Sequence, residues 1–135
     1  MQNSLKYILG NKITEYFPSL PFNDTVCNFL SDLSKNILKN DANKKFPDVL
    51  TFAFWCRSSN ITRIKNKIID NNKYRTGIGL VFHIAPSNVP LNFAYSFVFG
   101  LLTGNSNIVK LPSNNFPQIE IICKEMKKLF KKKKY

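Results

Sequence analysis

The spacing of apolar residues changes once along the chain. Up to about residue 73, apolar side chains recur every three or four positions, which is typical of amphipathic helices. Three helices are predicted there. One is capped by Asn23 or Asp24, one begins at Pro47, and one begins at the polar group 58–60. From Gly77 onward the apolar runs are short and separated by turn residues, a pattern that indicates strands.

The stretch from Gly77 to Ser113 predicts a strand, a turn, a helix, a turn and a second strand. The expected elements are a buried strand over 78–84, a helix from about Pro90 to Leu102 and a strand over 107–111, with Gly104 and Asn105 ending the helix. Two strands joined by a helix should be adjacent and parallel, with a right-handed crossover.

This order of elements predicts the α/β class. A mainly helical N-terminal segment, residues 1–73, precedes the start of an α/β cofactor domain in residues 74–135. The chain of 135 residues has room for one domain at most. A single strand–helix–strand unit leaves one sheet edge and one sheet face uncovered. The chain is therefore either a small domain or a piece of a larger one.

Charge adds little to this interpretation. The formal net charge is +12, but residues 120–135 alone hold seven lysines and two glutamates. The abundance of Lys, Asn, Ile and Phe is typical of an AT-rich genome. We therefore expect no nucleic-acid partner. A basic nucleic-acid-binding module remains an alternative, which would require affinity that falls steeply with salt.

The cysteines and the single histidine do not predict a metal site. Cys27, Cys56 and Cys123 form no Cys-x-x-Cys pair and have no histidine nearby, so we expect no metal and three buried structural thiols. His83 lies inside the first strand and is expected to be a satisfied sheet residue, with a catalytic base as the alternative. An odd number of cysteines without an export signal favours the cytoplasm.

Two polar side chains stand at the predicted strand ends, where open α/β sheets bind ligands. Asn88 lies between Pro86 and Pro90, which stiffen the turn. A rigidly held amide can donate to a developing oxyanion, or Asn88 can simply cap the following helix. Lys110 ends the second strand, and a lone lysine there is usually only solvated.

These residues carry a resemblance. The segments A-P-S-N-V-P-L at 85–91 and G-N-S-N-I-V-K-L-P-S at 104–113 resemble the aldehyde dehydrogenase superfamily, which has a Pro-x-Asn-x-Pro turn, a helix and then Gly-Asn-x-x-x-x-Lys. The longer string V-F-H-I-A-P-S-N-V-P at 81–90, with F-W-C-R-S-S-N at 54–60, is similar to the long-chain acyl-CoA reductases of LuxC type.

The resemblance implies an activity and a cofactor. Such enzymes reduce a long-chain acyl-CoA or acyl-protein thioester to the fatty aldehyde with NADPH, through an acyl-cysteine. Asn88 would donate to the thioester oxygen. The nicotinamide and its ribose would lie along the backbone of Ile84, Ala85, Pro86 and Ser87, and Lys110 would hold the adenosine ribose. Ser113 stands where many NAD-preferring members carry Glu, which favours NADPH.

The resemblance also implies what is missing. The superfamily's nucleophilic cysteine and its second glycine motif lie further downstream, and none of the three cysteines matches the nucleophile by position. The chain is thus expected to be the N-terminal part of a reductase and to be inactive by itself. In the full-length relative, partners would include a homo-oligomer or an acyl-transfer protein. The alternative is a non-catalytic remnant, serving in nucleotide binding or assembly.

Overall fold

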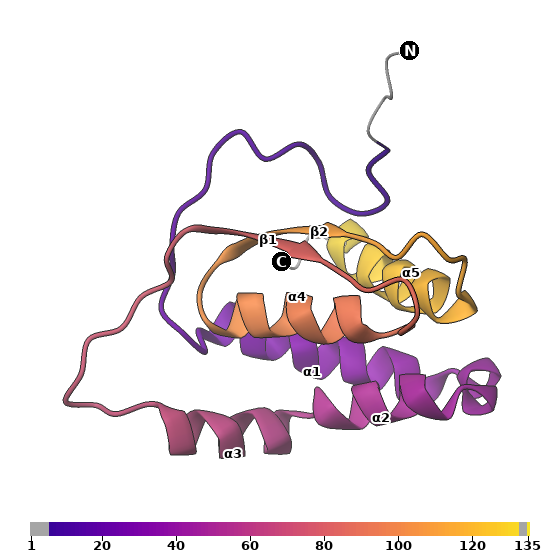
Figure 1. The fold of residues 1–135 in the computed structure, drawn as a ribbon. Helices are drawn as coiled ribbons and strands as arrows, with labels where there is room; N and C mark the ends of the chain where they lie inside the picture. Colours follow the sequence, from indigo (N-terminus) through magenta and orange to yellow (C-terminus); the bar gives the residue numbers. More distant parts are fainter. Residues whose placement is uncertain (1–5, 133–134) are drawn as a thin grey trace, which may run out of the picture.

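The computed structural model describes residues 6–132 and 135. Its elements, in chain order, are α1 (Asp24–Lys39), a short 3₁₀ helix η1 (Asp41–Lys45), α2 (Pro47–Trp55), α3 (Ser58–Ile68), β1 (Leu80–Ile84), α4 (Asn92–Leu102), β2 (Ser106–Lys110) and α5 (Pro117–Lys131) (Figure 1). The described part of the chain is mostly helical with a two-stranded parallel sheet, in agreement with the predicted α/β class.

The first helices begin close to the predicted positions. The side chain of Asn23 accepts a hydrogen bond from the amide of Val26 at 3.0 Å and so caps α1. Pro47 is the first residue of α2, where its missing N–H costs no helical hydrogen bond. The polar group 58–60 does not supply the cap of α3, because Arg57 occupies the cap position and makes no side-chain hydrogen bond there.

The sheet has the predicted parallel pairing. Leu80 pairs with Ser106 at one end of the ladder, and Ile84 pairs with Lys110 at the other. The connecting helix α4 lies against one face of both strands (Figure 1). It begins at Asn92 and not near Pro90, while β1 begins two residues later than predicted. These are differences of boundary, and the order of elements is confirmed.

The prediction of a buried first strand is wrong. Phe82 is 60% exposed and Ile84 is 70% exposed, and Ile108 on β2 is 39% exposed. Alternate residues of a strand point to opposite faces, and α4 covers only one of them. In the part of the chain that the structure describes, the other face is open to solvent.

The core lies on the covered side of the sheet, around α1. This helix contacts α2, α3, α4 and α5. Figure 1 shows α4 between the sheet and α1, with α2 and α3 below α1. The fully buried side chains with the largest volume come from both halves of the chain and include Phe52, Leu30, Leu33, Ile37, Ile61, Leu102, Ile122 and Met126.

The start of β1 is held where three backbone segments meet. The amide of Ser19 donates to the carbonyl of Gly104 at 2.9 Å, and the amide of Gly77 donates to the carbonyl of Ser19 at 3.0 Å. A Cβ atom on Gly77 would lie 2.1 Å from the Gly104 oxygen, so a larger residue there is excluded. The backbones of these segments therefore approach closely at the entry of β1.

Candidate functional site

The candidate site is the edge of the sheet at which both strands end. Ile84 and Lys110 are the last paired residues of β1 and β2. The amide of Ala85 then donates to the carbonyl of Lys110 at 3.2 Å, which extends the pairing by one bond. The two connections that carry the predicted site residues therefore leave the sheet side by side.

Asn88 lies in the exposed turn between β1 and α4. The cap position of α4 belongs to Leu91, and no side chain makes a capping hydrogen bond there. The alternative in which Asn88 caps this helix is therefore wrong. Pro86, Ser87 and Asn88 are all exposed, so the amide of Asn88 is accessible to a ligand.

A hydrogen bond ties this turn to the loop after β2. The side-chain amide of Asn114 donates to the carbonyl of Ser87 at 2.8 Å. Asn114 directly follows Ser113, which is exposed like Lys110. The structure thus brings the loop of Asn88 and the loop of Ser113 together. Asn114 was not predicted, and its position after Ser113 was the only signal in the sequence.

The asparagines of the second motif have structural partners. Asn105 accepts from the amides of Ile78 and Gly79 at 2.7 and 3.1 Å, at the opposite edge of the sheet. The side-chain oxygen of Asn107 lies 2.8 Å from the Nε2 atom of His83, within hydrogen-bond distance. His83 is therefore the satisfied sheet histidine that was predicted, and Asn105 fixes the entry of β1.

The thiols lie on other elements and are protonated at neutral pH. Burial raises the pKa of Cys56, at the end of α2, to about 12. Burial also raises the pKa of Cys27 in α1 and of Cys123 in α5. Cys56 and Cys123 are buried as predicted, whereas Cys27 is only half-buried, which corrects that expectation. A thiolate is the reactive form, so none of these thiols is an activated nucleophile.

The charges around the site suit an anionic ligand. The sequence contains no Asp or Glu between Asp70 and Glu120, so both edge loops lack a carboxylate. Lys110 and Ser113 supply an ammonium and a hydroxyl at the exposed edge, a donor set that fits the phosphates and ribose of a dinucleotide. Within residues 6–132 and 135, no three His, Cys, Asp or Glu side chains gather to hold a metal ion.

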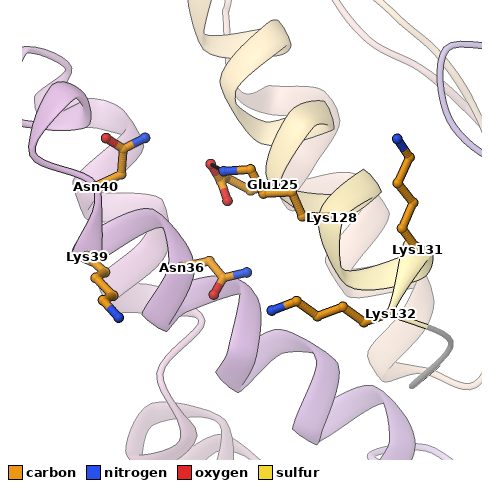
Figure 2. Close-up of a pocket in the computed structure, with 7 residues that line it drawn as sticks. All are labelled: Asn36, Lys39, Asn40, Glu125, Lys128, Lys131 and Lys132. Carbon is orange, nitrogen blue, oxygen red and sulfur yellow. Dashed lines mark hydrogen bonds and ion pairs between the residues drawn. The ribbon is translucent and has the colours of Figure 1, made fainter.

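Surface hollows lie at other places on the molecule. One lies between α1 and α5, where Lys128 pairs with the buried Glu125 at 2.6 Å (Figure 2). Neither Lys39 nor Lys131 points toward this pair in Figure 2. Both lie in the last turns of their helices, where a cation interacts favourably with the helix dipole. The second hollow lies between α3 and α4.

The parallel strand–helix–strand unit defines the class of protein, an α/β protein whose sheet ends in exposed polar loops. The family model for acyl-CoA reductase (LuxC) matches residues 61–133, which is more than half of the chain. The chain belongs to this family of acyl-CoA reductases. The segment 54–60 lies outside the matched residues. No curated protein and no solved structure gave a significant match. Among the residues described, no helix is long and apolar enough to cross a membrane.

Proposed function

We propose that this chain forms the cofactor-binding edge of an NADPH-dependent reductase that converts a long-chain acyl-CoA or acyl-protein thioester to the fatty aldehyde. The observation that carries the proposal is the joining of the two edge loops, through Ala85 to Lys110 and through Asn114 to Ser87. This joining supports a single ligand that contacts both loops. Family membership supports the class of reaction.

Each site residue has a separate role in this proposal. Lys110 binds the adenosine ribose, and Ser113 donates to the 2′-phosphate. The backbone of 84–87 lies along the nicotinamide end, and Asn88 donates to the thioester oxygen as negative charge develops on it. NADPH supplies the hydride when it is bound. An aldehyde dehydrogenase-like, Rossmann-type arrangement is part of the same proposal.

We further propose that the 135-residue chain does not catalyse this reduction by itself. Covalent catalysis requires a thiolate facing the oxyanion donor. The three cysteines belong to α1, to the end of α2 and to α5, and burial keeps their thiols protonated. The nucleophile then lies outside this chain, and the chain acts as a nucleotide-binding part of a reductase. Three free thiols are also consistent with the reducing cytoplasm as its location.

The test is an assay of the purified, folded chain for NADPH-dependent release of aldehyde from a long-chain acyl-CoA. We expect no turnover, together with weak NADPH binding that Lys110→Met reduces. Turnover that is lost in Asn88→Ala and in one single cysteine variant would promote that cysteine to nucleophile. Turnover that survives both changes would indicate a contaminating enzyme. Comparison of independent preparations identifies such a contaminant.

A further inference from the structure

The hollow between α3 and α4 has the composition of a small-molecule site. Its volume is about 480 Å³, within the range of ligand pockets. It is lined by the second half of α3, the end of α4, the segment 74–76 and two residues before α1: Ile64, Ile68, Ile69, Phe99, Leu102, Thr103, Tyr74, Arg75, Thr76, Pro21 and Phe22.

Apolar side chains make up most of the lining of the hollow. Phe22 and Leu102 form the floor and are almost fully buried, at 4% and 2% exposure. Ile68 and Phe99 remain 48% and 53% exposed at the rim. Leaving such side chains in contact with water is unfavourable, and an apolar ligand would remove that cost.

Arg75 supplies a charged group at this hollow. One N–H of its guanidinium donates to the carbonyl of Ile68 at 3.3 Å, which holds the side chain at the rim. A guanidinium carries five N–H groups, so it can bind a carboxylate as well. Arg75 is the one charged residue among those that line the hollow, and the nearby carboxylate of Asp70 pairs with Lys73 at 3.4 Å. The rim is therefore complementary to an anion.

We propose that this hollow, hereafter the α3–α4 pocket, binds a long-chain carboxylate, with the hydrocarbon tail over Phe22 and Leu102 and the carboxylate on Arg75. The pocket meets the C-terminal end of α4, whereas Asn88 precedes the N-terminal end. An 11-residue helix is about 16 Å long, so the pocket is separate from the carboxyl edge of the sheet. The proposal does not rest on reductase activity.

The chain contains a natural reporter for this pocket. Trp55 is the only tryptophan, and its ring meets that of Phe99 edge-on, with 5.3 Å between the centroids. A ligand that packs against Phe99 changes the surroundings of Trp55. Titration of the 135-residue chain can therefore be followed by intrinsic fluorescence, with calorimetry as an independent measure of binding.

The experiment compares four probes below their aggregation concentrations: decanoate, dodecanoate, dodecanol and dodecyltrimethylammonium. Dodecanoate should bind saturably and about tenfold more tightly than decanoate, because two more methylenes are buried. Dodecanol and the ammonium compound should bind at least about tenfold more weakly, because neither offers a carboxylate to Arg75.

Two matched variants test the role of the arginine. Arg75→Gln should weaken dodecanoate binding about tenfold, while Arg63→Gln should leave it unchanged. Arg63 lies on the exposed side of α3 and donates to Asn60 outside the pocket. Circular dichroism checks that both variants fold. Equal binding of dodecanoate and dodecyltrimethylammonium, equal affinity in Arg75→Gln, or no calorimetric binding of dodecanoate would each overturn the proposal. These results are independent of the reductase assay, which uses none of the four probes.

Discussion

Ser113 lies one residue before the asparagine that joins the loop after β2 to the turn after β1. In the proposed site its hydroxyl donates to a 2′-phosphate. The change Ser113→Glu should therefore lower the affinity for NADPH and spare that for NADH. Two charges about 4 Å apart in water repel by about 1 kcal/mol, so the preference should shift by about fivefold. The ratio of the two dissociation constants, measured by titration, checks this.

The matched control is Asn115→Glu, which adds the same charge two residues further along the same exposed loop. It should weaken NADPH and NADH binding by similar, small factors. If Ser113→Glu and Asn115→Glu changed the ratio equally, Ser113 would not be the residue that recognises the 2′-phosphate.

Cys56 makes stability depend on pH above neutrality. Burial raises the pKa of its thiol from the ordinary 9.0 to about 12 in the folded chain. Above pH 9 the unfolded chain releases this proton while the folded chain keeps it, so stability falls as pH rises from 9 towards 12. Between pH 9 and 10.5 the loss from this thiol should be about 1.5 kcal/mol. Urea unfolding at several pH values measures it.

The control for the thiol is Cys56→Ala. This variant should be less stable at pH 8, because it leaves a small cavity, but its stability should fall less steeply with pH. Cys27, Cys123 and Tyr95 have raised pKa values too and keep some of the dependence. An unchanged slope in Cys56→Ala would contradict the assigned burial of this thiol.

At the scale of elements, the packing of α4 on the sheet depends on Gly100. A Cβ atom there would lie 1.8 Å from the side-chain oxygen of Asn107, which His83 holds in place. Replacing an interior helical glycine by alanine usually stabilises a helix by about 1 kcal/mol. Here Gly100→Ala should instead destabilise the chain by roughly 1–3 kcal/mol, because the new methyl group collides with a held side chain.

A second variant separates collision from other effects. In the background Asn107→Ala, the collision at 1.8 Å is removed, and His83, 3.0 Å from the Cβ position, loses the hydrogen bond that holds it. Gly100→Ala should then become neutral or stabilising. Thermal unfolding of the unsubstituted chain, the two single variants and the double variant gives the coupling free energy between the two substitutions. Additive effects of the two substitutions would contradict the close contact between α4 and β2.

The order of these elements could be predicted because each is encoded locally. Asn23 caps α1, Pro47 opens α2, and Gly104 ends α4 through a backbone with positive φ of 83°. Burial on the sheet could not be predicted in the same way. The run of apolar residues in β1 indicates two covered faces, but which faces are covered depends on elements distant in sequence.

In the candidate site, too, the features encoded locally could be predicted, and the contacts between distant segments could not. Asn88 and Lys110 stand beside turn residues, and parallel strands bring them to one edge. The bond from Asn114 to Ser87 spans 27 positions of sequence, and the place of Asn114 beside Ser113 does not identify Ser87 as its partner. The α3–α4 pocket likewise joins segments distant along the chain, from Phe22 to Leu102, so only the folded arrangement reveals it.

At the scale of the whole molecule, the open face of the sheet should promote association. Within the described residues, Phe82, Ile84 and Ile108 form an exposed apolar surface on a sheet of two strands whose outer edges are unpaired. Ile84→Lys should shift sedimentation towards the monomer, since a charge there opposes burial of the face. Phe54→Lys, on the exposed side of α2, should not. Equal effects of the two changes would exclude the sheet face as the surface of association.

The proposed function depends on the binding of NADPH at the carboxyl edge of the β1–β2 sheet. The most direct measurement is a titration of the isotope-labelled chain with NADPH, followed by the amide resonances of each residue. We predict saturable changes at residues 84–88 and 110–114, with a dissociation constant on the order of 1 mM and weaker binding in Lys110→Met. Absence of saturable changes at these residues, or changes confined to the hollow between α1 and α5, would contradict NADPH binding at the carboxyl edge of the sheet.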